Sequence, residues 1–472
     1  MATSRHFFLN LRRDVTDAFT RDALAPHGYL VPPQRVGPTL RSLAGDVSQR
    51  GYETLVDNGN FAVLGRVRKR HAIAAGEISN AVRALEERLG RSARRRDIPT
   101  GLRAQLKALV SEATASVAEL VPTAGDQLAR QLTLTPSRLI GVEDIVPACL
   151  LALDIEPRLG GSDRSSLRRR NTAVARGASA ACSTLPRELR RQYFPVASAN
   201  SFNTAHDAGR IFASHGHRRI AMGFGAYMAD SNYVDHFRVG RSTTTLKRRI
   251  PNRYLRTVLV ARGFWEGYVS ELGKPPLAFH FLGLGAPIML PLVSLVAWGT
   301  PELTFDATSP VKDATRGGTL YVSKPAYLKV RTRKVALKLV TTDREWDCPC
   351  PYCQDFIRRH PFQYREARRV WQTIGREAVV AADLTEGGPL FGLMPLLSEP
   401  RGGYLRKAVN FTRTGHNHWA MFEVLRELDG AGARKTQARR HVAEVVESYR
   451  RVTSPVFSFA LDVAFSVATG AL

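Results

Sequence analysis

Short β-prone runs and longer stretches with helical spacing alternate along most of this chain. Apolar β-prone runs predict strands over residues 52–56, 145–154, 192–198, 219–225, 277–282 and 303–306. Helices with one apolar face are predicted over residues 205–214 and 253–272. Strands that alternate with helices are typical of an α/β protein with a parallel sheet. Because several of these strands end in aspartate or glycine, the pattern favours a (β/α)8 TIM barrel over an open sheet.

Residues 71–121 interrupt this alternation with a helical pattern. One apolar face is formed by Leu102, Leu106, Leu109, Val110, Ala113, Val117 and Leu120. Residues 94–97 and Pro99 separate two helices, and arginine and lysine occupy the outer faces. The stretch is therefore predicted as a helical insertion in the barrel and as a candidate nucleic-acid surface.

An aspartate at the end of the last predicted strand is the first candidate for chemistry. Asp306 follows an apolar run, and Lys312 and Arg316 come soon after it. Neighbouring cations favour the ionised form of a carboxylate, which can then attack an electrophilic sugar carbon. The same cations can hold the phosphates on either side of that sugar. The alternative is that Asp306 caps a turn and the two cations are solvated.

Two further aspartates follow predicted strands. Asp57 precedes Asn58-Gly59, although this dipeptide is also a strong hairpin signal, so Asp57 alternatively belongs to a turn. Asp154 ends the run 145–154, predicted as a strand, and alternatively caps or turns the chain before Pro157.

Three cysteines lie within six residues, as Cys348, Cys350 and Cys353. In a reducing compartment such spacing indicates a thiophilic metal rather than disulfides, and Cys3His ligation of zinc is a common structural arrangement. His416, at the predicted start of a helix, is the expected fourth ligand. His418 is the reserve, and His360 is closer in sequence but belongs to a basic helix.

The charge balance is strongly basic, with 68 Lys and Arg against 42 Asp and Glu and a formal net charge of +26. Such an excess is the electrostatic footprint of a nucleic-acid partner. The N-terminal residues show no apolar core of a secretory signal, and glycines and prolines interrupt the apolar run 281–298. A cytoplasmic protein that does not enter the membrane is therefore expected.

Several of these motifs, in this order, resemble the tRNA-guanine transglycosylases. The segment 305–316 resembles that family's nucleophile segment, which runs Phe-Asp, three residues and Pro, then Thr-Arg-Asn-Ala-Arg. Residues 56–61 resemble its Thr-Asp-Ser-Gly-Gly-Phe, and residues 221–225 its Ile-Gly-Gly-Leu. Leu153-Asp154 stands where the family has a base-recognising aspartate, and the cysteines followed by Thr414-x-His416-Asn417 match its zinc site.

The resemblance implies a (β/α)8 catalytic barrel over residues 1–345, with the helical insertion at about 71–121. A zinc-binding subdomain would follow over residues 346–430 and a C-terminal helical segment over residues 431–472. Asp306 would be the nucleophile that displaces guanine, and Asp57 the general acid/base. The expected substrate-binding residues are Asn58, Asp154, Gly223, Phe224 and Gly225.

Departures from the family pattern shift the expected substrate from tRNA to DNA. The family's Val-Gln-Gly-Gly appears here as Val196-Ala-Ser198-Ala, and the spacing between Cys353 and His416 is much longer than in the tRNA enzymes. The pattern is closer to the divergent branch that inserts 7-deazaguanines into DNA, for which 7-cyano-7-deazaguanine or a relative would be the free base. Helicase or ATPase proteins are candidate partners, because the target nucleotide must be unstacked. The alternatives are exchange on tRNA and a non-catalytic barrel that binds nucleic acid.

Overall fold

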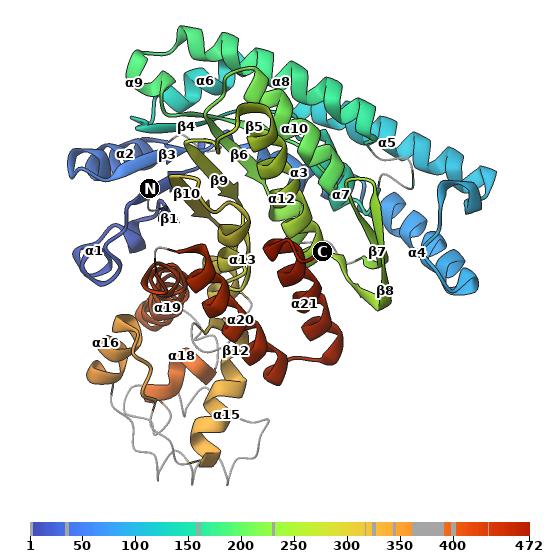
Figure 1. Cartoon of the computed structure of the whole chain (residues 1–472). Coiled ribbons are helices and arrows are strands. Elements are labelled where there is room, and N and C mark those ends of the chain that lie inside the picture. Colours follow the sequence, from blue (N-terminus) through green and yellow to red (C-terminus); the bar gives the residue numbers. More distant parts are fainter. Residues whose placement is uncertain are drawn as a thin grey trace.

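The computed structural model shows eight parallel strands that close into a barrel, with helices around it (Figure 1). It describes residues 3–33, 37–156, 159, 162–228, 232–316, 318–322, 327–342, 346–360, 391–397, 403–432 and 434–472. The strands are β1 (Ser4–Asn10), β2 (Gly28–Val31), β3 (Glu53–Val56), β4 (Arg138–Glu143), β5 (Tyr193–Ala197), β6 (Arg219–Gly223), β9 (Ala278–Leu282) and β10 (Glu302–Asp306). Their order around the barrel is β1-β10-β9-β6-β5-β4-β3-β2, which confirms the predicted α/β barrel.

The barrel strands are apolar on both faces because both faces are covered. Phe8, Leu30 and Ile140 point into the barrel, whereas Phe7 and Leu9 pack outward against the helices. On the outside, α10 (Phe202–Ser214) and α12 (Asn252–Leu272) pack closely together because glycines face the partner helix. A Cβ at Gly209 or Gly267 would clash with the backbone of the other helix.

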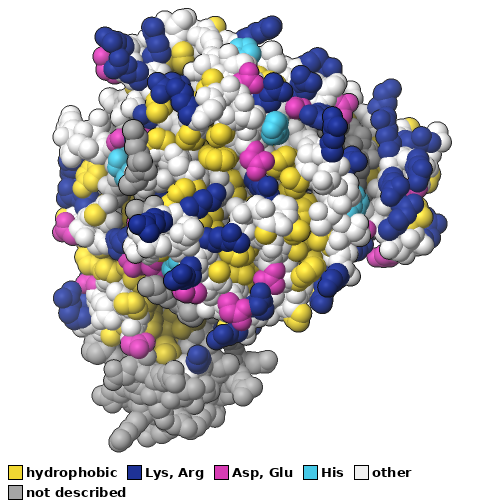
Figure 2. Space-filling model, viewed as in Figure 1, with side chains coloured by type: hydrophobic (Ala, Val, Ile, Leu, Met, Phe, Trp, Pro, Cys, Tyr) yellow, Lys and Arg dark blue, Asp and Glu magenta, His cyan; other side chains and the backbone are white. Residues whose placement is uncertain are grey.

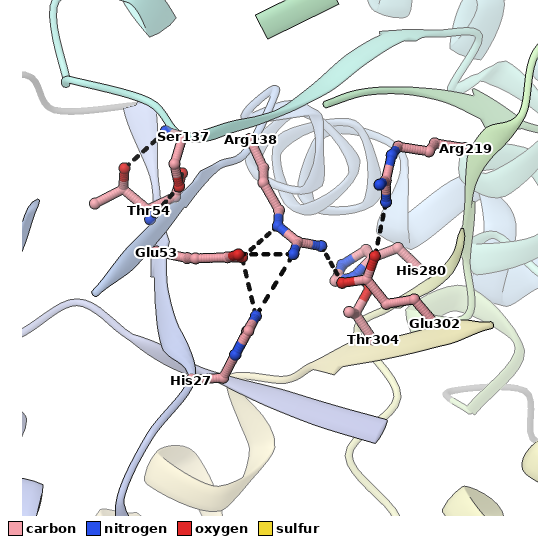
Figure 3. Close-up of polar contacts among 9 residues, drawn as sticks. All are labelled: His27, Glu53, Thr54, Ser137, Arg138, Arg219, His280, Glu302 and Thr304. Atoms are coloured by element: carbon pink, nitrogen blue, oxygen red, sulfur yellow. Dashed lines mark hydrogen bonds and ion pairs between the residues drawn. The ribbon is translucent and has the colours of Figure 1, made fainter. Parts of the chain in front are cut away.

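An ion-pair network closes the N-terminal end of the barrel (Figure 3). Arg138, which is 5% exposed, pairs with Glu53 and Glu302. Arg219 also pairs with Glu302, at 2.7 Å, and His27 lies 3.1 Å from Glu53. These residues lie at or just before the starts of strands, so the network joins strands at the end of the barrel opposite the usual active site. We therefore assign the network to stabilisation of the barrel.

Most predicted elements are confirmed. The runs 192–198, 219–225, 277–282 and 303–306 form β5, β6, β9 and β10, and the predicted helices match α10 and α12. The run 145–154 is wrong as a strand, because it forms α7 (Val146–Ala152), with Pro147 in its first turn. The strand at this point of the chain is β4, which pairs with β3 and β5. A short apolar run does not by itself distinguish a buried helix from a buried strand.

The helical insertion is confirmed and extends beyond the predicted residues. It contains α3 (Asn60–Arg70), α4 (Ala72–Leu89), α5 (Thr100–Leu120) and α6 (Ala124–Leu132). Helices α3 to α5 share an apolar cluster with α7, separate from the main core. A hairpin of β7 (Tyr233–Val239) and β8 (Ser242–Pro251), which the sequence pattern did not indicate, lies beside this insertion (Figure 1).

The C-terminal part covers the barrel with helices and a small hairpin. It contains α14 (Ser309–Thr315), β11 (Thr319–Tyr321), β12 (Lys329–Arg331), α15 (Thr332–Thr342), α16 (Pro351–Arg359), α18 (Met394–Leu397), α19 (Gly403–Gly430), α20 (Lys435–Val452) and α21 (Pro455–Thr469). His416 lies within α19, so the prediction that it opens a helix is wrong. Part of the predicted subdomain, residues 361–390, lies outside the described residues. Within the described chain, the helices are too short or too polar to cross a bilayer.

Candidate active site at the barrel mouth

Three carboxylates meet at the C-terminal mouth of the barrel. Asp306 is the last residue of β10, Glu143 is the last of β4, and Asp57 directly follows β3. The pKa of Asp57 is raised to about 7, first by burial and then by the negative charges of Asp306 and Glu143. The structure therefore brings the predicted pair Asp57 and Asp306 into one electrostatic site, with Glu143 as a third member that sequence reasoning missed.

Asp306 is 5% exposed and is held from one side of the barrel. Its Oδ1 accepts hydrogen bonds from the Gly283 N–H at 3.1 Å and from His280 Nε2 at 3.1 Å. His280 Nδ1 lies 2.7 Å from the Thr304 hydroxyl. Both hydrogen bonds of His280 form when the Thr304 hydroxyl donates to Nδ1 and the Nε2–H group donates to Asp306. This arrangement fixes the tautomer of His280 and the direction of the Asp306 carboxylate.

Among the described residues, neither expected cation forms an ion pair with Asp306. Lys312 Nζ lies 5.3 Å from the centre of the Phe61 ring, and Arg316 is exposed at the end of α14. His280 was missed because a histidine inside the apolar run Phe279–Leu282 reads as core. Ala278 lies in the same inner cluster as Phe8, and side chains two residues apart on a strand share a face. The spacing of His280 from Ala278 is therefore the signal that would have placed His280 inside the barrel.

Glu143 faces the loop that carries Asp57. Its Oε2 accepts hydrogen bonds from Asn58 Nδ2 at 3.0 Å and Asn60 Nδ2 at 3.1 Å. Burial raises the pKa of Glu143. A Cβ at Gly223 would lie 3.7 Å from Glu143 Oε1, so Gly223 borders this carboxylate. The signal in the sequence was Glu143-Asp144 directly after an apolar run, which the wrongly placed strand at 145–154 concealed.

The loop from Asp57 to Asn60 is fixed by two glutamines of α6. Gln131 Nε2 donates to the Asp57 carbonyl at 2.9 Å, and Gln127 Nε2 donates to the Asn58 carbonyl at 2.7 Å. Gly59 adopts a φ of 82°, in the left-handed region that favours glycine, and the chain then enters α3. The hairpin alternative for Asn58-Gly59 is therefore excluded, and the predicted substrate residue Asn58 supports Glu143.

Residues 223–225 divide between the mouth and the core. Phe224 is fully buried and packs on Phe281, with ring centroids 5.2 Å apart, so this predicted substrate residue belongs to the core. Gly225 borders the mouth, since a Cβ there would lie 3.0 Å from the ring of Phe61. Phe61 is 47% exposed, which leaves much of an aromatic ring in solvent beside the site.

Asp154 follows a helix, α7, rather than a strand. Its backbone has a φ of 59°. Its carboxylate lies 3.9 Å from Arg83 and at 3.5 Å from both Ser79 and Asn232. These neighbours belong to α4 and to the residue before the β7–β8 hairpin. Asp154 therefore contacts the insertion, and the strand end predicted for it is wrong because α7 precedes it. Its role in base recognition, which the family resemblance implies, stays a prediction.

A basic groove of about 1290 Å³ extends from the mouth toward α20 and α21. Phe61, Gly225, Gly283 and Ser309 line its inner end. The cations that line it are Arg253, Lys312, Lys329, Arg331, Lys334 and Lys338. Asp313 is the carboxylate that lines it, and Lys329 pairs with Asp313 at 2.8 Å. The groove carries an excess of positive charge beside the carboxylates.

A second cluster can hold a metal ion. Cys348, Cys353 and His416 lie together, with His416 Nδ1 3.4 Å from each sulfur. His416 Nε2 donates to the Tyr321 carbonyl at 2.8 Å, which leaves the Nδ1 lone pair directed at the thiols. The pKa of Cys348 is lowered, with hydrogen bonds from Cys350 and Cys353 as the largest causes, so Cys350 belongs to the same cluster. This donor set fits a thiophilic metal.

His418, the reserve ligand, lies outside this cluster. It is fully buried against Phe7 of β1, with ring centroids 6.4 Å apart. Between the two histidines, Asn417 accepts from the Tyr321 N–H at 2.8 Å and donates to the Pro310 and Thr319 carbonyls at 3.0 Å. α19 thereby joins the cysteine cluster to β11 and α14.

A comparison of the chain with protein-family models and with curated proteins finds no match. The fold and the site geometry are therefore the basis for any functional conclusion.

Proposed function

We propose that this protein is a transglycosylase that exchanges guanine in DNA for a 7-deazaguanine base. The observation that carries the proposal is the pair of Asp57 and Asp306 at one barrel mouth, with the pKa of Asp57 raised to about 7. A group that is half protonated near neutral pH suits proton transfer, and an oriented carboxylate beside it suits nucleophilic attack. Two carboxylates at one anomeric carbon are the arrangement used in glycosyl transfer with a covalent intermediate.

In the proposed reaction, an Asp306 oxygen bonds to C1′ while the bond between C1′ and guanine N9 breaks. Protonated Asp57 donates its proton to the leaving guanine, which departs as a neutral base. The incoming base then loses its N9 proton to Asp57, and N9 attacks C1′ and releases the Asp306 carboxylate. The hydrogen bonds from His280 and Gly283 keep Asp306 directed at the sugar through both steps.

The base is proposed to lie beside Glu143. A carboxylate at this position can accept hydrogen bonds from the N–H groups on the guanine edge. Gly223 and Gly225 leave room for a flat ring, and the exposed ring of Phe61 can stack on it. We therefore prefer Glu143 to Asp154 as the base-recognising group. The charge of Glu143 raises the pKa of Asp57, whereas Asp154 contacts the insertion.

The basic groove is proposed to hold the nucleic-acid backbone, with Lys312 next to the target nucleotide. The sequence pattern favours DNA, and tRNA is the alternative substrate. Cys348, Cys350, Cys353 and His416 would hold a zinc ion, which when bound would stabilise the fold around α16 and α19.

The test is to supply the purified protein with 7-cyano-7-deazaguanine and either DNA or tRNA, then to digest each and identify modified nucleosides by mass spectrometry. We expect the modified nucleoside in DNA, and Asp306→Asn should abolish it while nucleic-acid binding persists. Product in tRNA alone would transfer the proposal to tRNA. Binding without product in either nucleic acid would indicate a non-catalytic barrel.

A further inference from the structure

Two additions to the barrel lie next to each other at the same end as the carboxylates. The arm, formed by α3, α4 and α5, begins directly after the Asp57–Gly59 loop. The β7–β8 hairpin follows α11 (Gly225–Met228), beyond the end of β6. The Ser92 N–H donates to Asp235 at 3.4 Å, and Arg249 pairs with Glu86 at 3.2 Å, so arm and hairpin are in direct contact.

Carboxylates join the two additions from the inside. Glu86 is 6% exposed and accepts from the Ala93 N–H as well as from Arg249. Asp154 lies between Arg83 of α4 and Asn232 at the start of the hairpin. Glu86 and Asp154 are therefore engaged between the arm and the hairpin. At the tip, Asp97 pairs with Arg91 at 2.7 Å.

The outer surface of the arm and hairpin is basic. Arg94, Arg95 and Arg96 are exposed at the tip between α4 and α5, and Arg241 and Lys247 are exposed on the hairpin. Figure 2 shows Lys and Arg side chains gathered at the right-hand edge, where Figure 1 places α4 and α5. The 18 residues of α4 span about 27 Å, which is about the length of eight base pairs along one strand.

We propose that the arm and the β7–β8 hairpin form a clamp that binds the phosphate backbone of duplex DNA beside the target nucleotide. The proposal rests on the proposed function for its choice of DNA. The arginines and lysines of the arm and hairpin are spread over a length that matches the two phosphate backbones of a duplex. Contacts to phosphates position a protein on DNA without reading its sequence. The exposed aromatic ring next to the carboxylates, Phe61, lies at the mouth, where an unstacked nucleotide would be received.

The test replaces Arg94, Arg95 and Arg96 together by glutamine. The matched control replaces Arg187, Arg191 and Arg218, which are exposed near the starts of β5 and β6 at the opposite end of the barrel. Binding of a 30-base-pair DNA duplex is measured by fluorescence anisotropy over a series of salt concentrations, without free base. Equal melting temperatures of both variants and wild type verify folding.

We expect the arm variant to bind the duplex at least tenfold more weakly at about 0.1 M salt, with a salt slope reduced by about 2–3. The control should match wild type. Equal affinity and slope for the arm variant and the control would overturn the clamp, as would an effect confined to single-stranded DNA or to duplex RNA. Because the assay involves no base exchange, its outcome is independent of whether the protein is a transglycosylase.

Asp154→Asn tests the connection between arm and hairpin. We expect faster hydrogen exchange in β7 and β8 than in wild type, with Asp126→Asn on exposed α6 as the control. Unchanged protection of the hairpin, together with loss of base exchange on a short oligonucleotide, would instead support a base-recognising role for Asp154.

Discussion

Asp57 combines burial with two neighbouring carboxylates, and this combination has a consequence for both rate and stability. With a pKa of about 7, it can exchange a proton with the base near neutral pH. We expect kcat/KM to follow an ionisation near pH 7 and Asp57→Asn to lower turnover by at least about 100-fold. Steady-state rates between pH 5 and 9 measure both, and turnover of the variant close to wild type would contradict the acid/base role.

The same residue should destabilise the fold at high pH. A folded pKa above the ordinary value means that stability is fully present below pH 4 and is lost as the pH rises toward 7. Asp57→Asn removes this loss, so its melting temperature at pH 8 should exceed that of wild type by on the order of 2 °C. Calorimetry at pH 4 and pH 8 separates this effect from a general change in packing, which would be equal at both.

His280 should act on the reaction through Asp306. His280→Phe keeps an aromatic ring among Phe8 and Phe194 but removes the hydrogen bond to the carboxylate. We expect kcat to fall by about 10- to 100-fold with little change in KM, because a misdirected nucleophile loses rate rather than binding. His280→Gln, which retains a donor, should recover part of the rate. Equal rates for both variants would contradict this positioning role.

At the scale of elements, the sequence predicted those site residues that directly follow a short apolar run and also lie at the end of a barrel strand. Asp57 and Asp306 follow short apolar runs with recognisable flanking residues, and both lie at the barrel mouth. Glu143 was missed because the run after it, which forms α7, has the composition of a buried strand. The contacts of Asp154 with Arg83 and Asn232 could not be predicted, because these residues lie 71 positions before it and 78 positions after it in the sequence.

The cysteine cluster gives a prediction at this scale. If the cluster binds a metal, Cys350→Ser should lower both metal content and soluble yield, because the proposed metal would join α16 to α19. Cys182→Ser, on α8 (Arg164–Thr184), is the matched control and should retain the wild-type metal content. Metal analysis and thermal melting check the prediction, and a folded, metal-free Cys350→Ser protein would refute a structural metal.

At the scale of the whole molecule, the two ends of the barrel carry different kinds of polar groups. The mouth collects carboxylates of raised pKa, whereas the N-terminal end holds ion pairs (Figure 3). Burial, followed by the charge of His27, lowers the pKa of His6 to about 4. Burial alone would raise the pKa of Glu53, but hydrogen bonds from His27 and Arg138 outweigh it and lower the pKa to about 2.

These depressed pKa values predict acid sensitivity. The contribution of neutral His6 is present above its ordinary pKa of 6.5 and is lost as the pH falls toward 4. That of Glu53 is lost between about 4.5 and 2. Because Asp57 acts in the opposite direction over this range, the prediction concerns the difference between two proteins. The melting temperature of His6→Phe, relative to that of wild type, should rise as the pH falls from 6.5 to 4. A variant with the same pH dependence as wild type would exclude His6 as the cause.

Asn417 links the cysteine cluster to the segment that follows Asp306. This buried amide spans from Tyr321, whose carbonyl His416 binds, to Pro310, four residues after Asp306. We expect that a chelator, by removing a metal from the cysteine cluster, would also loosen the first turn of α14, which begins three residues after Asp306. Under the proposed function, chelation would therefore lower the rate of base exchange before the barrel itself unfolds.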